Sequence, residues 1–394
     1  MSRGRVLHDF LKNSLSFVHA KRLNAFTEVI TAVTDGAGLT ISQIGRSIRN
    51  SAKIKHNIKK VDRLCGNNKL QSEVPEFYSS MAAVMLKKLP KSLPIIIDVC
   101  YLKDHHELQT IRASFVINKR SLTLYELSYP GSEMKKSHEQ FLQQLRKIIP
   151  ENQSIIFLLD AGFKANWCNN IAAYGWDWIA RIRNKGGHCY LNNGSNWLSP
   201  SSLFLKVKQS SHEFGNILWS KKNKLSCRLV GFTKKIKGII KKTYSGKRSK
   251  QKDSKSYSRN HREPWLLATS LNSTTHSPKD IARIYEKRMS IEEGFRDLKS
   301  HRFGLQARYS GTKSSCRWNI LLLIANFALF IIWMVGWHVR KLDLASGYQS
   351  NTRKNRKEFS DIFLGKIYLQ KLSFQERERC IANAWSLLKN EVMI

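Results

Sequence analysis

Two short runs of aliphatic residues, each followed by an aspartate, constrain the fold of this chain most strongly. Residues 94–97 read PIII before Asp98, and residues 154–159 read SIIFLL before Asp160. Continuous apolar runs of this length are typical of strands that are buried on both faces of a sheet. We expect each run to be such a strand, ending at its aspartate, and the pair predicts an α/β fold.

The segments that follow continue the same pattern. The expected elements are a hairpin of strands 108–117 and 122–127 around residues 118–120, a helix at 139–149, a helix ending at 174 and a strand at 176–183. This order is that of a ribonuclease-H-like α/β core. Residues 184–262 interrupt it with polar sequence and short β-like pieces such as 227–232. A buried strand at 265–271 then resumes the core, and Pro278 opens a further helix.

The whole chain therefore divides into five expected regions. They are a helical DNA-binding domain at 1–85, the first part of the core at 86–183, a β-rich basic insertion at 184–262, the second part of the core at 263–337 and a helical C-terminal tail, a candidate for dimerisation, at 338–394. Within the insertion, residues 234–262 carry twelve Lys and Arg against one acid. We expect that stretch to be mobile without DNA.

The charge of the chain points to a polyanionic partner. Lys and Arg number 67 against 29 Asp and Glu, which gives a formal charge of +38 and a pI near 10.1. Nucleic acid is the partner that such an excess favours, and the 42% hydrophobic content predicts a folded protein. The seven cysteines include no CxxC pair, which argues against a zinc module or a disulfide framework and fits a reducing cytosol. The first residues lack the apolar core of a signal peptide.

The N-terminal helices are candidates for DNA contact. Residues 20–32 are amphipathic, and residues 39–50 begin with a Thr/Ser helix start. Residues 53–63 then add a dense cationic strip, so the segment could contain a helix-turn-helix. Plain helix packing is the alternative, but the clustered charge favours DNA contact.

One stretch tests the expectation of a soluble fold. Residues 320–337 are almost continuously apolar and are barely long enough to span a bilayer. No second run of this kind exists in the chain. We therefore expect a buried helix behind the sheet, and no membrane partner.

A charged helix is expected from Tyr285 to Lys299. At about 100° per residue, Tyr285, Arg288, Glu292 and Lys299 fall within an arc of roughly 60°, with Arg296 near its edge. One carboxylate surrounded by cations and a phenol suits a metal-dependent enzyme that acts on nucleic acid. A solvated face with intrahelical ion pairs is the alternative.

Three acids could then share metal ions. Asp98 and Asp160 follow the two buried strands, and Glu292 arrives on the charged helix. Three carboxylates suit two Mg²⁺ ions, for which Mn²⁺ can substitute, because these metals prefer oxygen ligands. Other acids compete for these positions: Asp104 and Glu107 with Asp98, and Glu293 and Asp297 with Glu292.

The spacing of Tyr285, Arg288, Glu292 and Lys299 resembles the YREK signature of bacterial insertion-sequence transposases of the insertion-sequence-4 type. These are DDE cut-and-paste enzymes with a ribonuclease-H-like core. Further segments similar to this family are residues 20–30, 55–64, 160–167, 263–271 and 287–300. The likeness covers most of the chain and is weakest in residues 234–262 and in the tail.

The resemblance implies a role for each matching residue. The three acids would be the metal-binding catalytic triad. Tyr285, Arg288 and Lys299 would hold the phosphate backbone of the transposon end, with Arg296 beside them. Trp265 matches the position that stacks on a flipped base, although ordinary strand core is the other interpretation of that residue. Some relatives carry a second tryptophan where this chain has Met289.

The resemblance also implies a reaction and partners. The enzyme would nick the element's terminal inverted repeats, form and open a DNA hairpin, and join the freed end to target DNA. It would act as a homodimer on paired ends, in the bacterial cytoplasm at the nucleoid. The alternative is a catalytically inactive, transposase-derived repressor, which would need the charge but not the three acids.

Overall fold

The computed structural model describes twelve parts of the chain. They are residues 5–86, 92–102, 108–117, 120–183, 191–192, 196–207, 211–233, 251, 254, 263–301, 304–350 and 358–391. The chain forms two compact units. Unit 1 comprises residues 1–91, 98–153 and 290–394, and unit 2 comprises residues 92–97 and 154–289. Strand β1 (Ser92–Tyr101) contributes to both units.

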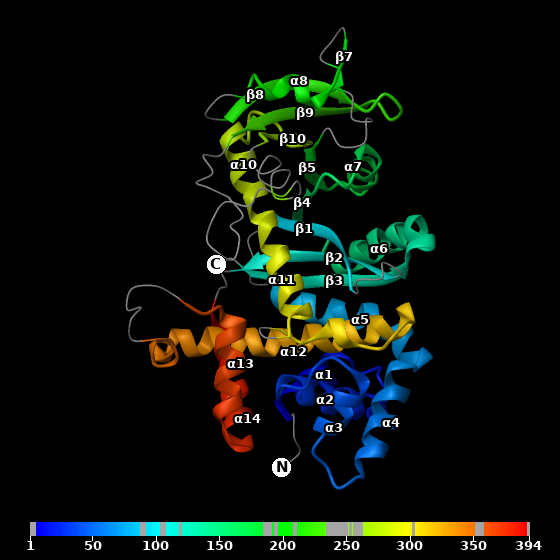
Figure 1. Ribbon diagram of the computed structural model, residues 1–394, viewed down its shortest axis with the longest axis vertical. Coiled ribbons are helices and arrows are strands. Elements are labelled where there is room, and N and C mark those ends of the chain that lie inside the picture. Colours follow the sequence, from blue (N-terminus) through cyan, green and yellow to red (C-terminus); the bar gives the residue numbers. More distant parts are fainter. Residues whose placement is uncertain are drawn as a thin grey trace. The chain divides into compact units, whose positions relative to one another are not determined.

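Unit 1 is mostly helical (Figure 1). Its helices are α1 (Arg5–Ser14), α2 (Ala20–Thr34), α3 (Ile41–Ser47), α4 (Ile54–Cys65), α5 (Asn68–Leu86), α6 (Met134–Ile148), α11 (Ser290–Lys299), α12 (Ser315–Lys341), α13 (Asp361–Lys371) and α14 (Phe374–Asn390), with short 3₁₀ turns η1 (Gly131–Glu133), η3 (Ala307–Tyr309) and η4 (Leu344–Tyr348). The antiparallel hairpin of β2 (Leu108–Ile117) and β3 (Arg120–Pro130) completes the unit, with β2 next to β1.

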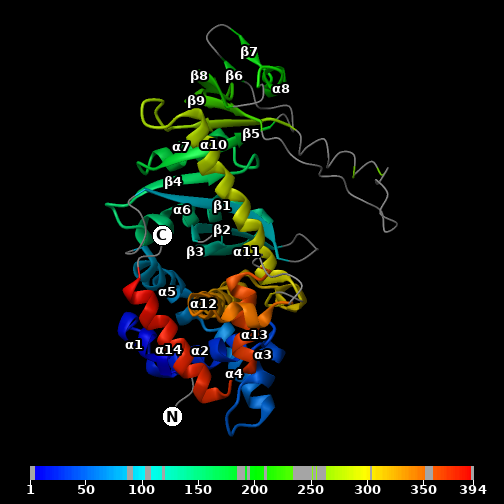
Figure 2. The same ribbon diagram turned by 90° about the vertical axis from the view of Figure 1, so that its left-hand side faces the viewer.

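The long apolar helix α12 is the centre of unit 1. It packs against β3 on one side and α2 on the other, and it also contacts α5, α13 and α14 (Figures 1 and 2). It is long and apolar enough to cross a membrane, but 94% of its apolar window is buried inside the protein. The expected buried helix at residues 320–337 is therefore confirmed.

Unit 2 is built around a mixed sheet. Its elements are β4 (Ser154–Leu159), α7 (Ala165–Ala172), β5 (Asp177–Ile182), β6 (Leu191–Asn192), β7 (Trp197–Leu198), α8 (Pro200–Phe204), β8 (Ser211–Trp219), β9 (Leu225–Phe232), β10 (Trp265–Thr269), α10 (Pro278–Glu286) and the 3₁₀ turn η2 (Lys287–Met289). The strands are hydrogen-bonded in the order β1-β4-β5-β10-β9-β8-β6-β7. The first three are parallel, and β10 pairs antiparallel with β5 and β9. The predicted α/β class is confirmed.

Strands β1 and β4, which were expected to end at Asp98 and Asp160, pair in parallel register. Ser92 pairs with Ser154, and the parallel register continues to Ile97 and Leu159. Strand β4 ends there, as expected. The expectation that the first strand also ends at its aspartate is wrong, because β1 continues to Tyr101. Val99 and Cys100 extend it, and burial of Cys100 inside unit 1 supports this extension.

The helix expected from Tyr285 to Lys299 is interrupted. Helix α10 ends at Glu286, the 3₁₀ turn η2 follows, and α11 begins at Ser290. Local periodicity favours a single helix, but the two parts pack in different units. The 3₁₀ turn advances about 120° per residue, so the single arc predicted for Tyr285, Arg288, Glu292 and Lys299 does not hold.

Some expectations lie outside the described residues. They are the tip of the hairpin at 118–119, most of the basic stretch 234–262, and the competing acids Asp104 and Glu107.

Candidate functional site

The two strand-associated aspartates are held by the backbone that follows them. Oδ1 of Asp98 accepts a hydrogen bond from the Val99 N–H at 2.9 Å. Oδ1 of Asp160 accepts one from the Gly162 N–H at 2.7 Å, which closes the turn after β4. A Cβ at Gly162 would lie 2.9 Å from the same oxygen, so this turn leaves no room for a side chain. Both carboxylates are half-buried.

Helix α11 presents three acids, and a single arginine of β3 engages two of them. Nη1 of Arg120 lies 2.7 Å from Oε2 of Glu293 and 3.2 Å from Oδ2 of Asp297. Glu292, one position before Glu293, is exposed on a different face of the helix. The two competing acids of α11 therefore share one partner on β3, Arg120.

The buried face of α11 packs on a charged pair inside unit 1. Arg112 donates to Oε2 of Glu126 from Nε at 2.8 Å and from Nη2 at 2.6 Å. The same guanidinium lies over the Phe295 ring, 4.6 Å from its centroid. Nζ of Lys299 approaches that ring at 5.7 Å. The contact of Arg112 with Phe295 therefore holds α11 against the hairpin, and Lys299 lies over the same ring.

The charges of Lys299 and Asp98 both affect the pKa of the Cys100 thiol. Burial raises the pKa of Cys100 to about 11, the positive charge of Lys299 lowers it, and the negative charge of Asp98 raises it. Lys299 and Asp98 therefore both lie near Cys100 in unit 1. The thiol itself stays protonated at neutral pH, so it is not a nucleophile.

In unit 2, Tyr285 lies at the end of β4. Its side chain is only 3% exposed, and its hydroxyl donates to the carbonyl of Leu159 at 3.2 Å. The sequence predicts that Tyr285 lies on a polar arc of the helix. That prediction is wrong, because Tyr285 lies on the buried side of α10 with Ile281 and Ala282. The hydroxyl thus joins α10 to the residue before Asp160.

Trp265 is half-buried in an aromatic and cationic cluster of unit 2. Its ring meets Tyr285 edge-on at 5.3 Å and lies 5.9 Å from Phe232. The guanidinium carbon of Arg181 lies 5.8 Å from the ring centroid. The indole is therefore supported on several sides, while part of it stays accessible at the start of β10.

Sequence reasoning missed two arginines of this cluster, Arg181 and Arg183. Burial lowers the pKa of Arg181 to about 10, with further contributions from the positive charges of Arg183 and Arg288. Within the described residues, Nε of Arg181 is buried without a hydrogen-bond partner, and Arg183 pairs with Glu263 at 3.5 Å. The available signal was their alternate spacing, with Arg181 on β5 and Arg183 directly after its end, because alternate residues of an extended chain lie on one face.

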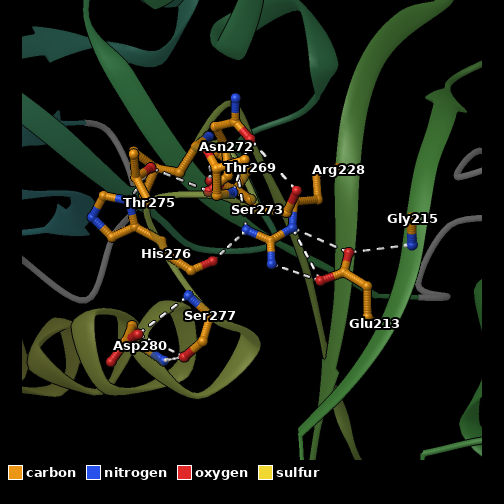
Figure 3. A network of polar contacts seen from close by, with 12 residues as sticks. Glu213, Gly215, Arg228, Thr269, Asn272, Ser273, Thr275, His276, Ser277 and Asp280 are labelled. Carbon is orange, nitrogen blue, oxygen red and sulfur yellow. Dashed lines mark hydrogen bonds and ion pairs between the residues drawn. The ribbon is translucent and has the colours of Figure 1, made fainter.

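A polar network fixes the connection from β10 to α10 (Figure 3). Arg228 of β9 donates to Glu213 of β8 from Nη2 at 2.6 Å and to the carbonyl of His276 from Nη1 at 2.7 Å. Ser277 and Asp280 then form a capping box that starts α10. The β8–β9 hairpin therefore holds the loop that sets the position of Tyr285.

The donor chemistry of the three acids fits hard divalent cations, since each offers carboxylate oxygen. Among the described residues, however, no three His, Cys, Asp or Glu side chains are grouped so that they could hold a metal ion. Asp98 and Glu292 belong to unit 1 and Asp160 to unit 2. The metal-binding triad stays a prediction, as do the DNA contacts of Tyr285, Arg288, Lys299, Trp265 and Arg296.

The mixed α/β sheet thus carries Asp98 within β1, Asp160 directly after β4, and Arg181 beside Trp265. Residues 100–327 match the family model described as the transposase DDE domain. The match covers more than half of the chain, so the protein belongs to this family. Asp160 and Glu292 lie inside the matched range, and Asp98 lies two residues before it. No match was found among curated proteins.

Proposed function

We propose that this chain is a cut-and-paste DNA transposase of the insertion-sequence-4 type with a ribonuclease-H-like core. Within that type, its sequence most resembles the transposase of the element flanking the tetracycline-resistance transposon. The proposal places the chemistry on Asp98, Asp160 and Glu292. The observation that carries it is the register of β1 and β4, whose last pair is Ile97 with Leu159.

The register supports a metal-binding role for Asp98 and Asp160, because each is covalently next to a residue of the last β1–β4 pair. Asp98 directly follows one member of the last pair, and Asp160 directly follows the other. Consecutive Cα atoms are about 3.8 Å apart, so neither aspartate can lie far from that pair. The Tyr285 hydroxyl donates a hydrogen bond to the carbonyl of Leu159 and so helps to fix the end of β4.

Two Mg²⁺ or Mn²⁺ ions, when bound, would supply charge stabilisation and an activated oxygen nucleophile. The three carboxylates would hold them through oxygen ligands. Glu292 is exposed, whereas its neighbours Glu293 and Asp297 both pair with Arg120.

The cationic residues of both units would position the DNA. In unit 2, Arg288, Arg181 and Arg183 offer guanidinium groups for phosphate oxygens. In unit 1, Lys299 and Arg296 offer two further positive charges from α11. Trp265 would stack on a base that leaves the duplex, for which a half-exposed indole is suited.

The proposed reaction is a series of phosphoryl transfers. Water attacks a phosphodiester at each element end and leaves a 3′-hydroxyl. That hydroxyl attacks the opposite strand, forms a hairpin and displaces the flanking DNA. A second water opens the hairpin, and the regenerated 3′-hydroxyl attacks target DNA. The N-terminal region, residues 1–85, would bind the terminal inverted repeats. The C-terminal region, residues 338–394, would support a homodimer on paired ends. The protein would act at the nucleoid of a bacterial cytoplasm.

The test is incubation of the purified chain with Mg²⁺ and duplex DNA carrying the ends of its own element. We expect nicked, hairpin and excised products on a denaturing gel, and none of them when EDTA replaces the metal. Specific binding without any cleavage, in Mg²⁺ and in Mn²⁺, would contradict the proposal and favour the inactive, repressor-like alternative.

A further inference from the structure

The hairpin of unit 1 buries an ion pair that the proposed chemistry does not use. Arg112 of β2 and Glu126 of β3 are register partners, and their side chains are 3% and 1% exposed. Oε2 of Glu126 accepts hydrogen bonds from Nε and Nη2 of Arg112. The hydroxyl of Tyr78, on α5, donates to Oε1 of the same carboxylate at 3.2 Å. Both oxygens of Glu126 are therefore engaged, and the guanidinium is held in one orientation.

Burial of this pair is weak evidence for a role in stability. The attraction between two buried charges roughly offsets the cost of removing them from water, so apolar side chains of similar volume often serve a core equally well. In some proteins a buried polar group instead specifies one arrangement of its neighbours. For the pair of Arg112 and Glu126, the neighbour to be arranged is the element against which the guanidinium packs.

That element is α11, the helix that carries Glu292 and Lys299. The guanidinium carbon of Arg112 lies 4.6 Å from the centroid of the Phe295 ring. A Cβ on Gly294, one residue earlier, would lie 3.7 Å from Nη1 of the same arginine. Nζ of Lys299 lies 5.7 Å from the centroid of the same ring. One aromatic ring thus links the buried arginine to the last residue of α11.

The electrostatics of Cys100 give independent support for this arrangement. Burial raises the pKa of its thiol to about 11, the positive charges of Lys299 and Arg112 lower it, and the negative charges of Glu126 and Asp98 raise it. All five residues belong to unit 1. The buried pair therefore acts on the same thiol as two residues that the proposed function uses.

We propose that Arg112 is a positioning residue for α11. Glu126 and Tyr78 fix its guanidinium, and the Phe295 ring carries that position to Lys299. The effect on cleavage rests on the proposed function, in which Lys299 holds the phosphate backbone, whereas the positioning of the helix does not. A misplacement of about 1 Å can cost a reaction about a hundredfold in rate, so the role is visible in kinetics.

The experiment replaces the whole network at once, with Tyr78→Phe, Arg112→Met and Glu126→Leu in one protein. No member of the network is left without its partner, so the triple variant should fold with a melting temperature near that of the wild type. At saturating DNA, single-turnover nicking should fall roughly tenfold to a hundredfold. End binding in EDTA should stay within about twofold. Amide hydrogen exchange in a peptide covering residues 290–299 should become about tenfold faster.

A double-mutant cycle distinguishes positioning of Lys299 from general loosening. Lys299→Ala should slow nicking at least about tenfold in the wild type, because it removes a phosphate contact. In the triple variant the same substitution should cost less than about threefold, since the lysine is already misplaced there. Equal costs in the two backgrounds would overturn the inference.

The matched control is a second buried cross-strand pair of the same hairpin. The hydroxyls of Thr110 and Ser128 lie 2.7 Å apart, and this register pair is two residues along each strand from Arg112 and Glu126. Thr110→Val combined with Ser128→Ala should nick within about threefold of the wild type, with α11 exchange unchanged. Near-normal nicking by the triple variant, or α11 exchange equal to that of the control, would overturn the inference.

Two further outcomes are separated by design. If the triple variant unfolds, Arg112→Lys replaces it, because lysine keeps the buried charge but not the planar group over Phe295. This variant should show the same two changes to a smaller extent, and wild-type nicking and exchange would overturn the inference. If the wild type cleaves no DNA, the proposed function fails by itself, and the exchange of α11 still decides the positioning.

Discussion

At the scale of residues, one guanidinium engages two of the three acids of α11. Arg120 engages Glu293 and Asp297, whose carboxylates are on the side of the sheet. Glu292 is exposed. Two acids of the helix therefore attach it to β3, and the role of metal ligand stays a proposal for Glu292.

The raised pKa of Asp297 predicts that the stability of the protein depends on pH. Burial raises its pKa to about 6 despite the opposing charge of Arg120. For an acid with a raised folded pKa, the stability contribution is present at low pH and is lost as pH rises through that value. Relative to Asp297→Asn, the wild type should lose roughly 1–2 kcal/mol of unfolding free energy between about pH 5 and pH 7.5. Urea titrations of both proteins measure this, and a pH-independent difference would refute it.

Trp265 makes a prediction about the hairpin step. Base stacking on an aromatic ring contributes about 1–3 kcal/mol, so Trp265→Ala should accumulate nicked ends and lower the ratio of hairpin to nick roughly tenfold. Trp265→Phe keeps a stacking surface and should retain most of the hairpin yield. Gel quantitation of both products is the measurement. A normal yield from the alanine variant would return Trp265 to a packing role.

At the scale of elements, the break between α10 and α11 is explained by what each helix contacts. Tyr285 joins α10 to β4 inside unit 2. The carbonyl of Ser290 accepts from the Ser121 hydroxyl at 3.1 Å inside unit 1, and Gly294 lies against the same serine. The 3₁₀ turn η2 lies where the chain passes from one unit to the other.

The close contact of Gly294 with Ser121 predicts that the effect of Gly294→Ala on stability changes sign when Ser121 is replaced by alanine. A Cβ there would lie 2.6 Å from Oγ of Ser121, so Gly294→Ala should destabilise the protein by about 1–3 kcal/mol. In a Ser121→Ala background the clash is absent. The same change should then stabilise the protein by up to about 1 kcal/mol through helix propensity. Thermal or urea unfolding of the four proteins checks this, and equal effects in both backgrounds would count against it.

Local sequence determined some elements well and others poorly. Strand β4 has the expected bounds because a continuous aliphatic run followed by Asp-Ala-Gly leaves few alternatives. Helix α10 begins at Pro278, as its capping residues indicate. The break at η2 and the burial of Tyr285 depend on contacts with residues far away in sequence. Arg181 was missed because a strand arginine resembles a solvated side chain until its neighbours are known.

At the scale of the whole molecule, the strong positive charge is distributed over two units that share β1. The apolar helix α12 provides the core of one unit, and the mixed sheet provides the core of the other. The central claim is that the proposed cleavage chemistry depends on Asp98, Asp160 and Glu292.

The most direct test compares two neighbouring acids of α11 in the Mg²⁺-dependent cleavage of element ends. Glu292→Gln should lower nicking at least a thousandfold while end binding persists, because an amide is a poor ligand for the metal. Asp98→Asn and Asp160→Asn should behave alike. Glu293→Gln removes the adjacent charge and should cleave within about threefold of the wild type. Near-normal nicking by Glu292→Gln, with normal binding, would contradict the account.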